Sequence, residues 1–186
     1  MTITLASASP RRSELLSKLT NDFTVEPSNI VEGSSHKNPK KRVREIARSK
    51  ALSVNGKVVL AADTMVYFKG KEYGKPKDAD DAVSMLTNLS CNWHTVYTAV
   101  CVKIDEKIYE FVCKSRVKFK ELPKELIFNY IEKYKPFDKA GAYGVQDNEI
   151  VERYRGSYSN IMGLPLEKLE KVLFKIEKTQ NIKLLG

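Results

Sequence analysis

Two adjacent arginines, Arg11 and Arg12, stand where a helix is expected to begin. They follow the alternating apolar run Ile3–Leu5, and the letters SASP at residues 7–10 are typical of a helix start. A cation at a helix N-terminus costs about 0.3–1 kcal/mol. A bound polyphosphate would reverse that cost, because guanidinium groups match phosphate oxygens. The alternative is a pair of solvated arginines screened by water and salt.

A carboxylate, Asp63, follows the apolar run Val58–Ala62 at the predicted end of a buried strand. Dry and rigid surroundings suit a general base or a metal ligand, and Thr64 offers a neighbouring hydroxyl. The alternative is an aspartate that closes a turn. Glu32, in a predicted loop, supplies a second carboxylate. Two carboxylates with several cations fit a divalent ion held between protein and phosphates, as is usual for Mg²⁺.

Two lysines and a glycine-containing segment complete the candidate set. Lys75 follows Gly74 in a predicted rigid loop, and Lys50 flanks the inward stripe of a predicted helix over 39–54. Both could contact phosphate, and the alternative for both is an ordinary solvated lysine. In DKAGAYGVQ, residues 138–146, the glycines permit close backbone approach to a ligand, and Gln146 carries an amide able to read a base edge. The alternative for this segment is a flexible surface loop.

Composition narrows the class of protein. The 186 residues are 42% hydrophobic, which predicts one globular domain over 1–186, or at most two closely packed lobes. The net charge of +9 favours anionic partners. No apolar stretch is long enough for a membrane span, and no signal peptide is recognised.

The three cysteines, Cys91, Cys101 and Cys113, are odd in number and do not have the spacing of metal ligands. Reduced thiols and a cytoplasmic location are therefore expected. Zinc-ligand spacing, a Ser-His-Asp set and a P-loop are also absent from the sequence.

Hydrophobic periodicity predicts a mixed α/β protein whose long antiparallel middle argues against a doubly wound parallel sheet. The predicted strands are Thr2–Ala6, Phe23–Glu26, Val58–Ala62, Met65–Phe68, Thr95–Ile104, Lys107–Lys120 and Ile150–Tyr154. The predicted helices are Pro10–Leu19, Pro39–Val54, Ala79–Leu89, Lys124–Lys133 and Leu166–Ile176. The segments 29–38, 138–146 and 156–164 are predicted to be irregular.

Several segments, in order, resemble the Maf family of nucleoside triphosphate pyrophosphatases. They are LASASPRRSELL, RSKA, AADTMV, GKP, DKAGAYGVQ and GSYSNIMGLPL, and they extend from residue 5 to 166. The resemblance implies hydrolysis of a nucleoside triphosphate to the monophosphate and pyrophosphate. It also implies an elongated mixed-sheet fold of the Maf and inosine triphosphate pyrophosphatase kind, with two lobes around a central cleft, and a homodimer.

The resemblance also implies roles for individual residues. Asp63 would be the proton acceptor, near or bound to Mg²⁺ or Mn²⁺, and Glu32 would help to bind that metal. The phosphates would be held by residues from four segments: Ser7, Arg12, Lys50 and Lys75.

The family's subgroups differ at three positions, which read Arg11, Thr64 and Gln146 in this chain. This trio is similar to the branch that prefers dTTP and UTP, whereas the branch acting on 7-methyl-GTP carries tryptophan in place of Arg11. Canonical and modified pyrimidine nucleotides both remain open.

The chain departs from the family pattern at two places. Cys91 stands after Ser90 where the family often has glycine, and Val31 precedes Glu32 where an acidic residue is frequent. The metal role of Glu32 therefore has less sequence support than that of Asp63.

The competing hypothesis is a non-catalytic basic regulator that binds a nucleotide or nucleic acid. A nucleic-acid binder needs basic residues with aromatic stacking partners, and the basic run 37–44 contains no aromatic residue. Asp63 and Glu32 would repel nucleic acid but suit a metal. We therefore expect an enzyme with a nucleoside triphosphate substrate, no stable nucleic-acid partner and no membrane association.

Overall fold

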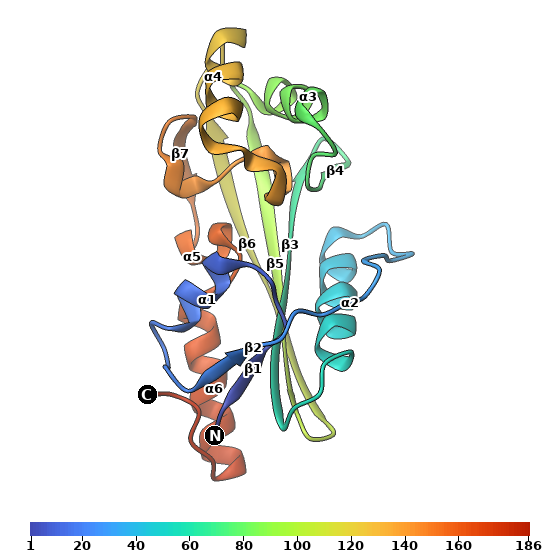
Figure 1. The fold of residues 1–186 in the computed structure, drawn as a ribbon, viewed down its shortest axis with the longest axis vertical. Coiled ribbons are helices and arrows are strands. Elements are labelled where there is room, and N and C mark those ends of the chain that lie inside the picture. The colour runs from blue at the N-terminus through green and yellow to red at the C-terminus, as the bar shows by residue number, and fades with distance from the viewer.

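The computed structural model describes residues 1–186 and is built on a seven-stranded sheet with the order β2-β1-β3-β5-β6-β7, in which β4 pairs with β3. Strand β1 is parallel to β2 and β3, and the other pairs are antiparallel. The strands are β1 Ile3–Leu5, β2 Phe23–Val25, β3 Val58–Phe68, β4 Lys71–Tyr73, β5 Trp93–Ile104, β6 Lys107–Phe119 and β7 Val151–Arg155. Figure 1 shows the long strands β3, β5 and β6 running along an elongated molecule. The predicted mixed α/β sheet is confirmed.

Helices cover both faces of this sheet (Figure 1). They are α1 Pro10–Leu16, α2 Pro39–Leu52, α3 Ala79–Leu89, α4 Lys124–Tyr134, α5 Tyr158–Met162 and α6 Leu166–Gln180, with 3₁₀ turns at Pro136–Asp138, Ala140–Ala142 and Val145–Asp147. None of these helices has the length and apolar character that crossing a membrane requires.

Three apolar clusters position the helices. One packs α1 and α6 against β1 and the first half of β3, through residues such as Leu16, Leu60 and Leu173. A second packs α3 and α4 against the other end of the long strands, and a third packs α2 against the opposite face through Ala47 and Ala61. The helices on one face therefore form a lower and an upper group along the strands.

Strand β3 corrects the sequence prediction at Asp63. Two strands interrupted at Asp63 and Thr64 were expected, with a turn there as the alternative for Asp63, but β3 continues without a break from Val58 to Phe68. Asp63 is paired in register with Ala99 of β5, and Thr64 with Thr98. The prediction was wrong because backbone groups form the ladder whatever side chains they carry, so polar residues can occupy the middle of a strand. Asp63 is thus held more rigidly than a turn would hold it.

The other differences are smaller. Helix α1 ends at Leu16 rather than Leu19, and α6 extends to Gln180 rather than Ile176. Strand β4 was not predicted, and neither was α5, which begins where the side chain of Ser157 accepts a hydrogen bond from the Asn160 N–H. The remaining predicted helices and strands are confirmed to within a few residues, and the segment 29–38 has no helix or strand before Pro39, as predicted.

Candidate active site

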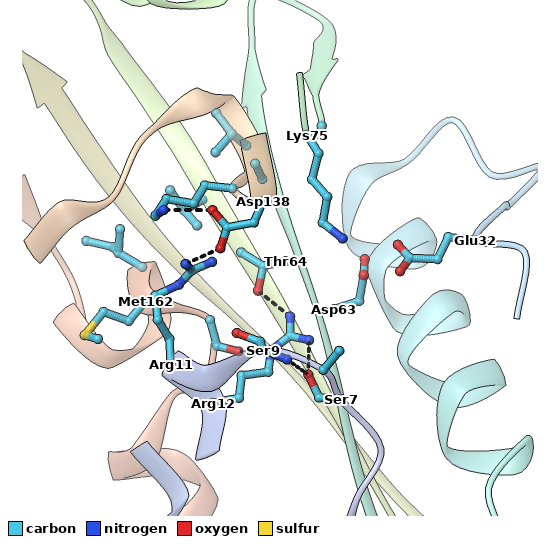
Figure 2. A pocket seen from close by; sticks show the side chains of 18 of the residues that line it. Ser7, Ser9, Arg11, Arg12, Glu32, Asp63, Thr64, Lys75, Asp138 and Met162 are labelled. Carbon is cyan, nitrogen blue, oxygen red and sulfur yellow. Dashed lines mark hydrogen bonds and ion pairs between the residues drawn. The ribbon is translucent and has the colours of Figure 1, made fainter. Parts of the chain in front are cut away.

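A single cavity of about 740 Å³ collects every site residue predicted from the sequence. They come from the loop after β1, from α1, the 29–38 loop, α2, β3, the loop after β4 and the last 3₁₀ turn: Ser7, Arg11, Arg12, Glu32, Lys50, Asp63, Thr64, Lys75 and Gln146. Figure 2 shows most of these side chains converging from both sides of β3.

A lysine bridges the two predicted carboxylates. Lys50 Nζ lies 2.9 Å from Asp63 Oδ1 and 2.9 Å from Glu32 Oε1. Lys50 belongs to the buried stripe of α2 and is only 6% exposed, as is Asp63. A buried lysine of this kind needs compensating charge, and the two carboxylates supply it.

The two carboxyl groups differ in proton affinity. Burial raises the pKa of Asp63, and the attraction of Lys50 and Arg12 offsets this only in part. Burial also acts to raise the pKa of Glu32. The hydrogen bond and charge of Lys50 outweigh this effect, together with the charges of Lys75 and Arg12, so the pKa of Glu32 is lowered. Asp63 is therefore the better proton acceptor of the two, and Glu32 holds its negative charge more firmly.

Neutral oxygens hold the half-buried guanidinium of Arg12. Its Nε donates to the carbonyl oxygen of Gly163 at 3.0 Å, Nη1 to Ser7 Oγ at 3.1 Å, and Nη2 to Thr64 Oγ1 at 3.2 Å (Figure 2). Thr64 in turn shares a hydrogen bond with Thr98 at 3.0 Å. Burial lowers the pKa of Arg12, yet a guanidinium stays protonated at neutral pH. Since no carboxylate pairs with it directly, its charge is available to an anion in the cavity.

Arg11 makes a different contact. Its Nη1 lies 2.7 Å from Asp138 Oδ2, and Lys139 Nζ lies 2.7 Å from the other oxygen of the same carboxylate. Partial burial would raise the pKa of Asp138, but its hydrogen bonds from Lys139 and Arg11 lower it. Arg11 is thus tied to the glycine-containing segment, on the side of the cavity away from Glu32 (Figure 2).

The glycine-containing segment needs a glycine at position 141. Gly141 has a φ of +72°, and a Cβ there would lie 3.0 Å from Val66 of β3. A Cβ on Gly144 would lie 2.5 Å from the amide nitrogen of Gln146. The side chain of Gln146 lines the cavity and makes no hydrogen bond inside the protein, so its amide is free for a ligand.

Lys75 is an exposed residue of the loop after β4. Figure 2 shows its side chain extending toward Asp63 and Glu32. It forms no ion pair, but its charge contributes to the lowered pKa of Glu32. The predicted position beside the other charged groups is therefore observed, and its role in phosphate binding stays a prediction.

Sequence reasoning assigned no role to several residues that organise the site. Asp138 orients Arg11 across 127 positions of sequence, and the carbonyl of Gly163 orients Arg12 across 151. Asn160 accepts a hydrogen bond from Thr98 through its carbonyl. All three lie inside the motifs DKAGAYGVQ and GSYSNIMGLPL, which is the only signal that marked them. Ser9 does occupy the N-cap position of α1, but its side chain makes no capping hydrogen bond.

The oxygen ligands present fit one class of metal. No group of three or more His, Cys, Asp or Glu side chains gathers in the structure to hold an ion. Asp63 and Glu32 therefore offer at most two carboxylates beside the cations that line the cavity. Mg²⁺ is commonly bound by one or two carboxylates together with substrate phosphates and water. The donor set fits such an ion and lacks the nitrogen and sulfur ligands typical of zinc.

Comparisons with known proteins identify the family of this chain. The family model described as Maf-like protein matches residues 2–176. The dTTP/UTP pyrophosphatase of Thermosipho africanus is 49% identical over 177 residues, which are 94% of this chain and 93% of that protein. Those of Aquifex aeolicus and Pyrococcus horikoshii are 46% and 44% identical, covering 93% and 94% of this chain and 94% and 98% of their own.

Among solved structures, the Ham1 protein of Staphylococcus aureus aligns with a TM-score of 0.46 at 13% identity. The alignment covers 64% of this chain and 72% of that one. This likeness is too slight to support an inference.

Proposed function

The chain belongs to the Maf family, and we propose that it hydrolyses dTTP and UTP to the monophosphate and pyrophosphate. One observation carries the proposal: a buried carboxylate with a raised pKa, Asp63, lies in the same cavity as Arg12, a cation without a direct ion pair. A proton acceptor and uncompensated positive charge are what hydrolysis of a phosphoanhydride needs.

The cavity has two chemically distinct ends. Arg12, Ser7 and Lys75 would bind the triphosphate, because they offer donors and positive charge next to Asp63. Arg11 and Gln146 would contact the base, since they lie on the glycine-containing side and Gln146 has a free amide. This orientation places the α-phosphorus nearest to Asp63.

The reaction needs one water molecule. Asp63 Oδ1 is held by Lys50, whereas Oδ2 has no hydrogen-bond partner in the protein and can accept a proton. Water would attack the α-phosphorus and pass its proton to Oδ2, while the bond from the α-phosphorus to the bridging oxygen breaks and pyrophosphate leaves. Arg12 and Lys75 would stabilise the negative charge that develops on the departing pyrophosphate.

We propose that Asp63 and Glu32 hold Mg²⁺ or Mn²⁺ together with the substrate phosphates. When bound, such an ion supplies Lewis-acid polarisation of phosphoryl oxygens. Lys50 contacts the same two carboxylates, so its single positive charge offsets part of the repulsion between them before substrate binds.

The proposal is tested by pyrophosphate release from a panel of nucleoside triphosphates with Mg²⁺ or Mn²⁺. dTTP and UTP are expected to be the best substrates, with EDTA abolishing turnover. Release of orthophosphate instead, or no activity with any nucleotide, would contradict it. The non-catalytic regulator has no support among the relatives above, which are named as enzymes. The single domain, the homodimer and the cytoplasmic location stay predictions; light scattering of the purified protein checks the homodimer.

A further inference from the structure

The end of the sheet near β7 carries a second charged surface, outside the cavity. Residues opposite one another in antiparallel strands share a face of the sheet. Two such rows cross β5, β6 and β7, and they place an aromatic residue and four cations on one face: Trp93 with Lys118 and Arg153, and Thr95 with Arg116 and Arg155. We call these residues the Trp93 face. None of them lines the cavity.

Trp93 is the only tryptophan in the chain, and three guanidinium groups surround its ring. Their carbon atoms lie 5.1 Å (Arg116), 5.6 Å (Arg153) and 5.3 Å (Arg155) from the ring centroid. Such distances are typical of cation–π contacts. The ring therefore holds together side chains that would otherwise repel each other.

Little negative charge compensates this cluster. Arg153 pairs with Glu152, its neighbour on β7, at 3.4 Å, whereas Arg116 and Arg155 have no ion pair. Lys118 donates to the carbonyl oxygen of Cys91 at 2.6 Å, which leaves its charge unbalanced. The arginines are exposed to solvent, so the Trp93 face is open to an anionic partner.

No helix covers this part of the sheet. Tyr97, Ala99 and Cys101 of β5 point to the same face as Trp93, and they pack under α2. Figure 1 shows α2 beside the middle of the long strands, while β7 lies nearer to their upper end. Further aromatic and basic residues border the uncovered region, because Tyr67 pairs with Thr95, and Tyr97 with Lys114.

The expectation of no stable nucleic-acid partner rested on the basic run 37–44 and did not consider this surface. We infer that the Trp93 face docks single-stranded nucleic acid. Proteins that bind single strands combine positive charge along the backbone path with aromatic or guanidinium planes on which bases stack. The Trp93 face offers positive charge and an aromatic ring on one face of a sheet, whereas the basic run 37–44 contains no aromatic residue. A second copy docked symmetrically here would bring like charges together, and an acidic peptide would leave the ring unused. Docking here does not involve Asp63 and is independent of the proposed hydrolysis.

The single tryptophan makes the test direct. Titration with a 15-nucleotide oligothymidylate is expected to change the emission of Trp93, since any ligand that reaches the arginines also reaches the ring. If the four cations of the two rows and Lys114 neutralise phosphates, the slope of log K against log salt is about −3.5. Affinity then falls roughly 100-fold between 50 and 200 mM salt.

A matched pair of variants locates the binding. The triple variant Arg116→Gln, Arg153→Gln, Arg155→Gln is expected to make the salt dependence less steep, with a slope of about −1.4. It should also weaken binding at least tenfold at low salt. The control, Lys40→Gln, Lys41→Gln, Arg44→Gln, removes the same charge from the exposed side of α2 and should leave affinity within about twofold. Pyrophosphate release should be unchanged in both, which also shows that they fold.

Three results would overturn the inference. In the first, neither the emission of Trp93 nor the anisotropy of a labelled oligonucleotide changes at 50 mM salt. In the second, the two triple variants lose affinity equally. In the third, polyglutamate binds as tightly as the oligonucleotide. The last result would assign the face to an acidic protein instead. Failure here leaves the hydrolysis proposal standing, and the inactive Asp63→Asn protein should still bind the oligonucleotide.

Discussion

The two ends of the cavity hold their cations in opposite ways. At one end, Lys50 is almost fully buried between Asp63 and Glu32, and it sits on a regular helix against a regular strand. At the other end, Arg11 and Lys139 share the more exposed carboxylate of Asp138, which belongs to a chain of 3₁₀ turns.

This difference indicates that the buried end of the cavity carries out the reaction and the exposed end selects the nucleotide. Buried charges on rigid elements keep their geometry and interact strongly, which favours transition-state stabilisation. Partly exposed groups on turns interact more weakly with one another and can change without loss of the fold, which suits recognition of the base. Substitutions at the buried end should therefore reduce turnover, and those at the exposed end should alter which nucleotide is used.

The largest effect is expected for Asp63→Asn. The amide is nearly isosteric but cannot accept the proton, so kcat for dTTP should fall by about 10²–10⁴-fold. Because burial raises the pKa of Asp63, the wild-type rate should also decline on acidification at a higher pH than an ordinary aspartate would give. Circular dichroism serves as the control for folding. Wild-type kcat in the Asp63→Asn variant would remove Asp63 from the mechanism.

Arg12→Lys should come next. Lysine keeps the charge, but its compact ammonium cannot span the three oxygens of Gly163, Ser7 and Thr64 that the planar guanidinium reaches. We therefore expect kcat/KM to drop by roughly 30–100-fold. Arg11→Lys is the matched control at the exposed end, and its kcat should stay within about threefold of wild type. If the two lysine variants lost kcat equally, the contrast between the two ends would be wrong.

A smaller and more selective effect is expected for Gln146→Ala. Loss of the free amide should raise KM for dTTP and UTP about tenfold with little change in kcat, because base recognition is weakened and the phosphates are still held. Steady-state kinetics across pyrimidine and purine triphosphates measures this. A fall in kcat with unchanged KM would place Gln146 at the chemical end instead.

The last prediction concerns the pH dependence of the free energy of unfolding, through a buried histidine that contacts a residue of the cavity wall. His94 Nε2 lies 2.9 Å from the hydroxyl of Tyr143, a cavity residue, and burial lowers the pKa of His94 to about 3. Between pH 6.5 and about 3 the unfolded chain binds a proton at this histidine and the folded chain does not. The free energy of unfolding should therefore fall on acidification by up to about 1.4 kcal/mol per pH unit.

His94→Gln should remove that dependence, since glutamine does not titrate. Urea unfolding at pH 7 and pH 5 gives the comparison with wild type. An identical difference between the two pH values in both proteins would show that His94 is not its source.

Most elements could be predicted from the sequence. The residues singled out in it line one cavity, and they could be recognised because Asp63, Arg12 and Lys75 each lie in a motif with a distinct chemical character. The sequence did not predict that Asp63 lies in mid-strand, since periodicity reports side-chain polarity and not backbone pairing. The pairing of Arg11 with Asp138 depends on packing between segments 127 residues apart. The Trp93 face was missed for a related reason: its cations are brought together only by strand register.

In the proposed mechanism, water attacks the α-phosphorus of the nucleotide near Asp63. Mass spectrometry of the products of dTTP hydrolysis in ¹⁸O-labelled water tests this step. The label should appear in thymidine monophosphate, with unlabelled pyrophosphate. Label in pyrophosphate, or formation of the diphosphate with labelled orthophosphate, would contradict the account.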